Sequence, residues 1–104
     1  MELNEFFEVS ILFSYYGSLL SDKQRTYMKE HFEEDYSLSE IAKSHGVSRQ
    51  AVYDNIKRGI KILKSYEEKI GFFEREKEIM EKLEELKNNY SETKLENLIA
   101  SFNI

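Results

Sequence analysis

The sequence contains no cysteine and no proline, and it has only four glycines. Without cysteine the chain forms neither disulfide bonds nor thiolate metal sites, which fits the reducing environment of the cytoplasm. Because proline is absent and glycine is rare, little in the sequence interrupts a helix. Runs of β-branched residues are also few. These absences together predict an all-α fold.

Long apolar runs are missing as well. The longest run without a charged residue extends from Val9 to Ser21 and has 13 residues, whereas a helix needs about 20 apolar residues to span a bilayer. The N-terminal stretch MELNEFFEVS is acidic and lacks the basic segment with which a secretory signal begins. We therefore expect a soluble, cytoplasmic protein that does not insert into membranes.

The charge of the chain is unevenly distributed. Its 104 residues are enough for one domain, or for one domain with an appended helix. The net charge is −5, but residues 1–40 carry −6, residues 41–66 carry +5 and residues 67–104 carry −4. A local excess of lysine and arginine is typical of a nucleic-acid-binding surface. A single solvated lysine-rich helix would carry the same local charge, so the charge alone leaves both interpretations open.

The basic segment coincides with a series of helix start and stop signals. Ser37, followed three residues later by Glu40, predicts a capping box at the start of a short helix. Gly46 is expected to end that helix in the left-handed conformation, and Ser48 is expected to cap a second, longer helix. Two hydrophobic staples are expected beside these caps, joining Tyr36 to Ile41 and Val47 to Val52.

The second of these helices has one apolar and one polar face. Its apolar residues recur every three or four positions and predict a buried stripe of Val52, Ile56, Ile60 and Leu63. A short helix, a glycine turn and a capped second helix form the sequence pattern of a helix-turn-helix. Such motifs place the N-terminal half of the second helix in the DNA major groove. The side chains expected on that outer face are Arg49, Gln50, Tyr53, Asp54 and Lys57.

Most side chains of this outer face have a chemical match on DNA. Gln50 can bind adenine through two hydrogen bonds, and Arg49 can bind guanine or a phosphate. Tyr53 can contact a thymine methyl group or a phosphate, and lysine and arginine can hold phosphates. Asp54 can accept a hydrogen bond from cytosine, but we expect it to pair with Arg58, four residues further along. The candidate nucleic-acid-binding residues are Lys43, Arg49, Gln50, Tyr53, Lys57 and Arg58.

Two resemblances follow from these motifs. Residues Ser37 to Leu63 resemble region 4 of bacterial sigma factors, in which a GVSR turn leads into the recognition helix. The longer run from Leu19 to Arg58, with its LLSDKQR and SRQAVYDNIKR blocks, resembles the YlxM family of small helix-turn-helix proteins from Firmicutes, and this resemblance covers about residues 1–75. His45 and Asn55 depart from the sigma-like pattern, which usually has an apolar residue at each position.

The resemblance carries expectations about fold and function. It implies a helical bundle with a sigma-region-4-like helix-turn-helix, of the winged-helix superfamily type but without a wing. It also implies a regulatory link to the signal recognition particle pathway.

Further helices are expected on both sides of the motif. Residues 2–20 form a first helix with apolar residues on more than one side, and Ser21 caps a second helix that extends to about Glu34. The recognition helix has no stop signal before Gly71. Beyond it, Phe72, Ile79, Leu83, Leu86 and Tyr90 form a weak coiled-coil-like pattern, and Ser91 caps a last short helix.

We therefore expect a helix-turn-helix bundle domain at residues 1–70 and a C-terminal helical extension at residues 71–104. This extension either folds back on the bundle or pairs with a second chain.

The sequence offers little support for catalysis. His31 and His45 fall in different predicted helices, and no phosphate-binding glycine loop, nucleophile elbow or metal-spaced cluster occurs. We expect a non-enzymatic regulatory protein with no cofactor and no metal. Two functions remain open: a DNA-binding regulator, or a protein- or RNA-interaction module that binds the signal recognition particle GTPase or its RNA. A homodimer is also expected, because the chain has more apolar surface than a monomer of this size easily buries.

Overall fold

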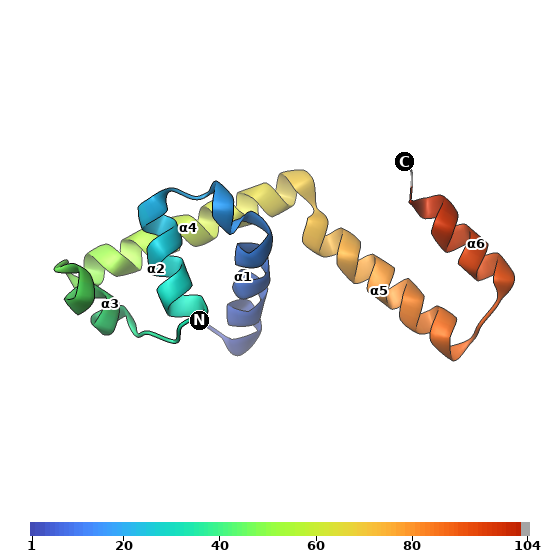
Figure 1. Cartoon of the computed structure of the whole chain (residues 1–104), viewed down its shortest axis with the longest axis horizontal. Coiled ribbons are helices and arrows are strands. Elements are labelled where there is room, and N and C mark those ends of the chain that lie inside the picture. Colours follow the sequence, from blue (N-terminus) through green and yellow to red (C-terminus); the bar gives the residue numbers. More distant parts are fainter. Residues whose placement is uncertain (103–104) are drawn as a thin grey trace. The chain divides into compact units, whose positions relative to one another are not determined.

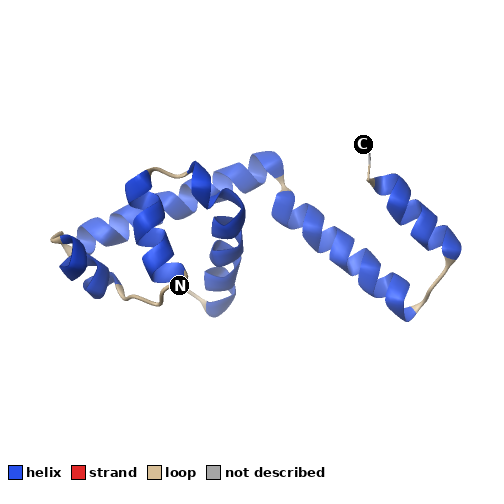
Figure 2. Ribbon diagram, in the orientation of Figure 1, coloured by secondary structure: helices blue, strands red, loops and turns tan. Residues whose placement is uncertain are grey.

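The fold is all-α, as predicted. The computed structural model describes residues 1–102, and over this part of the chain it contains helices and no strand (Figure 2). The α-helices are α1 (Leu3–Tyr16), α2 (Asp22–Phe32), α3 (Leu38–His45), α4 (Arg49–Ile70), α5 (Phe72–Asn88) and α6 (Glu92–Ser101). A 3-10 turn, η1 (Gly17–Leu19), follows α1. None of the helices in residues 1–102 is long and apolar enough to cross a bilayer.

The first helix is shorter than predicted, because α1 ends at Tyr16 and the next residues tighten into η1. The backbone N–H of Leu20 donates to the carbonyl of Gly17 at 3.1 Å, which closes the 3-10 turn. A Cβ at Gly17 would lie 2.9 Å from the ring of Phe13, so the turn packs directly on that ring. The apolar spacing continues through residues 17–20, and this spacing does not distinguish an α-helix from a 3-10 turn.

The chain forms two compact units, Met1–Gly71 and the residues from Phe72 onward. In the first unit α4 contacts each of α1, α2 and α3 (Figure 1). The helix ends where Gly71 adopts φ 76°, and the Gly71 N–H donates to the carbonyl of Glu67. This left-handed residue is the stop signal that the sequence predicts at the end of the recognition helix. α4 is therefore the helix around which the first unit is built.

The core of the first unit lies between these four helices. On α4, Val52 and Leu63 are fully buried and Ile56 is 5% exposed, so three residues of the predicted stripe are confirmed as core. Ile60 is only half-buried. The other helices contribute Val9, Leu12, Phe13 and Tyr16 from α1, Tyr27, Met28 and Phe32 from α2, and Ile41 and Ala42 from α3.

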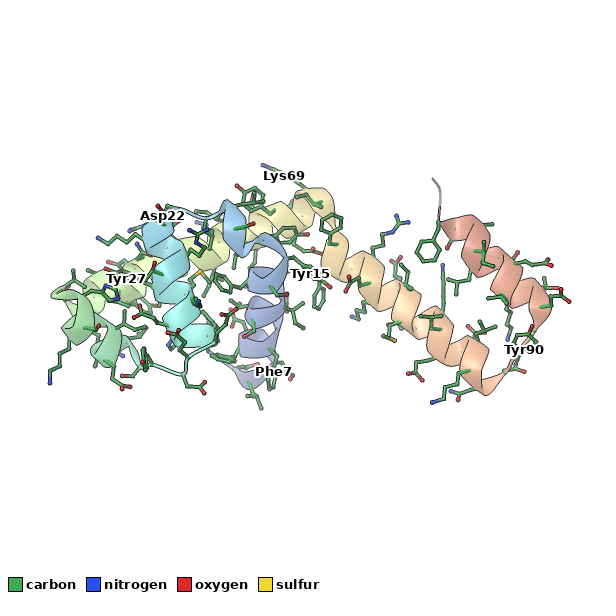
Figure 3. All side chains as sticks on the ribbon, in the orientation of Figure 1. Phe7, Tyr15, Asp22, Tyr27, Lys69 and Tyr90 are labelled. Carbon is green, nitrogen blue, oxygen red and sulfur yellow. The ribbon has the colours of Figure 1, made fainter. Side chains whose placement is uncertain are left out.

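α1 does not bury all of its apolar residues. Leu12 is buried, but Phe7 is 57% exposed (labelled in Figure 3) and Ile11 is 39% exposed. Leu3, one turn before Phe7, is 69% exposed. The helix thus meets the core along one side only, whereas the sequence suggested burial on more than one side.

The second unit consists of α5 and α6, which contact each other. Ser91 caps α6 as predicted, since its hydroxyl accepts the N–H of Lys94 at 3.3 Å. Lys94 also pairs with Glu85 of α5 at 3.2 Å. Leu98 is the one buried residue of this unit within the described part of the chain, so the hairpin has very little core of its own.

We predict that Val52→Asp unfolds the first unit. Val52 is fully buried, and a carboxylate placed there would be desolvated without a partner. The expected loss is at least on the order of 3–5 kcal/mol, which is a large part of the stability of a small domain. Thermal unfolding followed by circular dichroism measures the loss, with the exposed Gln50→Ala as control. A wild-type melting temperature for Val52→Asp would contradict the burial of this residue.

Candidate nucleic-acid interface

The turn between α3 and α4 has the geometry that the sequence predicts. Gly46 adopts φ 65° and ψ 34°, and the Val47 N–H donates to the carbonyl of Ala42 at 3.0 Å. The Ser48 hydroxyl accepts the N–H of Ala51 at 3.0 Å and caps the start of α4. Because glycine adopts a positive φ without steric cost, the chain can reverse here in very few residues. α3 and α4 therefore form a helix-turn-helix.

The start of α3 is held by the predicted capping box. The Ser37 hydroxyl accepts the N–H of Glu40 at 3.1 Å, and the Glu40 carboxylate accepts the N–H of Ser37 at 3.0 Å. Hydrogen bonds from the Ser37 backbone and then from its side chain lower the pKa of Glu40 below its ordinary value of 4.5. Tyr36 is 44% exposed, whereas Ile41, its partner in the predicted staple, is fully buried.

A histidine braces the end of α3 against α2. Nε2 of His45 lies 2.8 Å from a carboxylate oxygen of Glu30, and the His45 ring meets the ring of Tyr27 edge-on at 5.0 Å between centroids (Tyr27 is labelled in Figure 3). These contacts explain why a polar residue stands just before the turn glycine. The other histidine, His31, lies elsewhere, with Nδ1 2.8 Å from the carbonyl oxygen of Tyr36. In residues 1–102 no three acidic or histidine side chains gather as a metal site would require.

Four of the candidate residues lie together on the outer face of α4. At 3.6 residues per turn, Gln50, Tyr53 and Lys57 lie on the side of the helix away from Val52, and Arg49 lies at the edge of that side in the first turn. Tyr53 is 43% exposed, and the other three are exposed too. We call these four residues the α4 face. Arg58 is exposed at the edge of this face, and Lys43 is exposed on α3.

The α4 face carries positive charge that the described residues do not neutralise. Lys43, Arg49, Lys57 and Arg58 form no ion pair within residues 1–102. Nζ of Lys57 lies 5.8 Å from the centre of the Tyr53 ring, a cation–π distance that favours an outward position for this lysine. The arrangement can therefore offer charge to a phosphate backbone.

Asp54 does not have the partner that the sequence predicts. The Nε2 amide of Gln50 donates to Asp54 at 2.9 Å, and no ion pair joins Asp54 to Arg58 in the described residues. Gln50 and Asp54 are one turn apart, as Asp54 and Arg58 are, so helical spacing alone cannot choose between the two pairs. This hydrogen bond has a consequence for recognition. To donate to a base, the Gln50 amide must either use its second N–H or break its hydrogen bond to Asp54.

A groove that no sequence pattern predicts runs beside α4. The groove has a volume of about 590 Å³. Ile56, Ile60 and Leu38 provide apolar lining, and the same groove is bordered by three lysines of α4: Lys57, Lys61 and Lys64. Lys64 pairs with Glu5 of α1 at 3.3 Å. Lys61 and Lys64 contributed to the predicted basic segment, but only the packing of α4 against its neighbours reveals the groove that they border.

The fold and the exposed side chains of α4 define this chain as a helix-turn-helix protein. It belongs to the UPF0122 family, whose model carries the description "Putative helix-turn-helix protein, YlxM / p13 like" and matches residues 3–101. This confirms the resemblance to the YlxM family. The match extends further than the predicted range of about residues 1–75 and includes nearly all of α5 and α6.

Individual relatives cover most of the chain. The UPF0122 protein FN1394 of Fusobacterium nucleatum is 50% identical over 101 residues, which are 97% of this chain and 98% of that protein. The UPF0122 protein YofM of Lactococcus lactis is 47% identical over 91 residues, 88% of this chain and 82% of that protein. The UPF0122 protein gbs1018 of Streptococcus agalactiae is 51% identical over 73 residues, 70% of this chain and 66% of that protein.

We predict that Glu40→Ala destabilises the helix-turn-helix in a pH-dependent way. The folded-state pKa of Glu40 is lowered, so its contribution is complete above the unfolded-state pKa and disappears as pH falls through the folded-state value. The difference in melting temperature between wild type and variant should therefore be constant near neutral pH and shrink below pH 4.5. Glu34→Ala is the control, because the Glu34 side chain is exposed and has no hydrogen bond in the described residues. A difference that persists unchanged in acid would count against the capping box.

Proposed function

We propose that this chain is a DNA-binding regulatory protein whose α4 enters the major groove. One observation carries the proposal: Arg49, Gln50, Tyr53 and Lys57 share the exposed face of α4 directly after the capped turn. That is the part of a recognition helix that contacts base edges. The net charge of +5 in residues 41–66 supplies local attraction to phosphates.

The four residues of the α4 face take different roles in this proposal. Arg49 and Gln50 stand at the N-terminal end of the helix and read bases, guanine and adenine being their usual partners. Tyr53 contacts a thymine methyl group or a phosphate. Lys57 holds a phosphate, and Arg58 and Lys43 at the edge of the surface do the same.

The proposal extends to how the protein works as a whole. We propose a cytoplasmic, non-enzymatic regulator without a cofactor. We also propose that it acts as a homodimer, since helix-turn-helix proteins gain affinity and specificity by binding two half-sites at once.

The groove beside α4 favours a second candidate function. Phosphates need cations but no apolar surface, whereas this groove combines Lys57, Lys61 and Lys64 with Ile56, Ile60 and Leu38. Such a lining suits an acidic partner that also presents apolar side chains. The alternative is thus a protein- or RNA-interaction module, and the YlxM resemblance implies the signal recognition particle GTPase or its RNA as the partner.

We predict that Arg49→Ala with Gln50→Ala removes sequence preference. Each bidentate base contact is worth about 1–3 kcal/mol of discrimination, so a sequence selected by the wild type from random duplexes should lose its advantage. Lys57→Ala should instead weaken binding to all duplexes alike and lower the salt slope by about one. Titration of the selected and of a scrambled duplex at several salt concentrations measures both effects.

The matched control for these variants is Lys69→Ala, because Lys69 is an exposed lysine in the last turn of the same helix, outside the α4 face. It should bind the selected duplex as the wild type does. No enriched sequence from the selection, together with binding of the signal recognition particle GTPase or RNA that Lys61→Ala weakens, would replace the DNA reader with the interaction module.

Asp54→Asn should strengthen DNA binding. The substitution removes a negative charge beside the α4 face but keeps an oxygen that can accept from Gln50. Two charges about 4 Å apart in water interact by about 1 kcal/mol, so affinity should rise about fivefold at low salt and less at high salt. The same titration measures it, and weaker binding of Asp54→Asn would indicate that Asp54 itself accepts a hydrogen bond from a base.

A further inference from the structure

The groove beside α4 has an apolar lining and remains open to solvent at its edges. Ile56 is buried, and Ile60 and Leu38 are half-buried. Met1 and Tyr53 line the groove as well, but they are 65% and 43% exposed. A small-molecule site buries most of the surface of its ligand, which a groove with such exposed walls cannot do. The groove therefore suits the surface of a larger partner.

Positive charge follows this lining along α4. Lys57, Lys61 and Lys64 are separated by four and then three residues, so they share one side of the helix. Lys64 pairs with Glu5 at 3.3 Å, whereas Lys57 and Lys61 are exposed and form no ion pair within residues 1–102. These two lysines are one helical turn apart, about 6 Å along the axis. A partner that complements the groove therefore carries two negative charges at this spacing.

Negative charge and apolar surface together indicate a protein as the partner. The phosphates of a duplex match the lysines, but the backbone that carries them offers no apolar surface to cover Ile60 and Leu38. On a protein, a glutamate or aspartate beside a leucine, isoleucine or phenylalanine supplies both features at once. The groove is thus chemically different from the α4 face, whose exposed side chains are polar or aromatic.

The walls of the groove favour a helix over an extended peptide. An extended peptide binds by adding its backbone to a sheet edge, and residues 1–102 contain no strand that could pair with it. Against side chains alone its N–H and C=O groups would be buried without partners. A helix satisfies its own backbone, and it carries side chains one turn apart on one face, as α4 does.

We propose that this groove binds an acidic amphipathic helix of a partner protein. Apolar side chains of that helix, three or four residues apart, pack on Ile56, Ile60 and Leu38, and two acidic residues one turn apart pair with Lys57 and Lys61. The proposal gives the second candidate function a defined class of partner and rests on that function. It does not depend on DNA binding.

Occupancy of the groove has a consequence for the α4 face. Tyr53 and Lys57 belong to both surfaces, so a helix in the groove covers two side chains that the proposed DNA contact uses. If α4 binds DNA, the helix and the duplex therefore exclude each other, and each lowers the apparent affinity of the other by the same factor. This consequence rests on the proposed DNA-binding function as well. A protein with such a helix would act as an inhibitor of DNA binding.

Selection from a displayed library of helical peptides, with the full chain as target, tests the groove. The wild type should enrich peptides with two acidic residues four positions apart, beside apolar residues at three- and four-residue spacing. A synthetic peptide of the enriched sequence should bind Lys61→Glu at least roughly tenfold more weakly, because an attraction becomes a repulsion. Lys69→Glu is the matched control, since Lys69 is an exposed lysine of the same helix outside the groove, and it should bind the peptide as the wild type does.

Charge exchange tests the contact with Lys61 directly. Each acidic residue of the selected peptide is replaced in turn by lysine, and at one position the new peptide should bind Lys61→Glu more tightly than it binds the wild type. Circular dichroism should show the same helix content for Lys61→Glu and the wild type, because Lys61 is exposed. No enrichment of the acidic apolar pattern, or equal binding of the selected peptide by Lys61→Glu and the wild type, would overturn the proposal.

Competition with nucleic acid separates this proposal from the functions proposed above. The selected peptide should displace a duplex enriched by the wild type, and binding of both at once would overturn the mutual exclusion. An enriched duplex without an enriched acidic peptide would overturn the groove proposal and leave the DNA-binding function intact. RNA binding that Lys61→Ala weakens, again without an enriched acidic peptide, would overturn the helical partner and leave the interaction module intact.

Discussion

The close contact between α4 and α2 at Gly59 determines how the rest of the first unit is arranged. A Cβ at Gly59 would lie 2.5 Å from the sulfur of Met28, so this fully buried side chain would have to move to make room for it. Because α4 also contacts α1 and α3, this approach fixes the rotation of α4 about its own axis. Val52 and Leu63 then point into the core, and the α4 face points to solvent. The identity of the exposed residues is therefore a consequence of packing on the opposite side of the helix.

Asn55 shows that this rotation has a cost. It lies one turn before Gly59, is 8% exposed, and its Oδ1 has no hydrogen-bond partner within residues 1–102. An unsatisfied buried polar atom costs about 1–3 kcal/mol, and a leucine of similar size would avoid that cost. A slightly rotated α4 would expose Asn55, but it would also move Gly59 away from Met28. The close helix contact and the buried asparagine therefore occur together, and the departure of Asn55 from the sigma-like pattern reflects its place in this contact.

Local signals could be predicted from the sequence, and non-local ones could not. Ser37, Gly46 and Ser48 act on backbone groups within a few residues, so their spacing was enough to predict the helix-turn-helix. The close approach at Gly59 and the groove beside α4 depend on residues of other helices. The spacing of apolar residues within one helix does not show which residues of the other helices it will contact. The predicted partner of Asp54, Arg58, was wrong for another reason. Gln50 and Arg58 are both one helical turn from Asp54, so the spacing fits either residue equally well. The candidate residues of the α4 face were found together because they share one helix.

The charge distribution bears on specificity as well as on affinity. Non-specific DNA binding depends on phosphate contacts and falls with every uncompensated acid. The chain is acidic as a whole, at −5, and Asp54 stands beside the α4 face, so in the proposed function we expect weak binding to random DNA. A DNA-binding protein of this kind would depend on base contacts for its affinity. Because its non-specific binding would be weak, the many non-target sites of a genome would compete less for it, and the ratio of specific to non-specific binding decides how fully the target site is occupied. The proposed homodimer would add a second α4 face to the same particle and multiply that ratio without raising the local positive charge of either face.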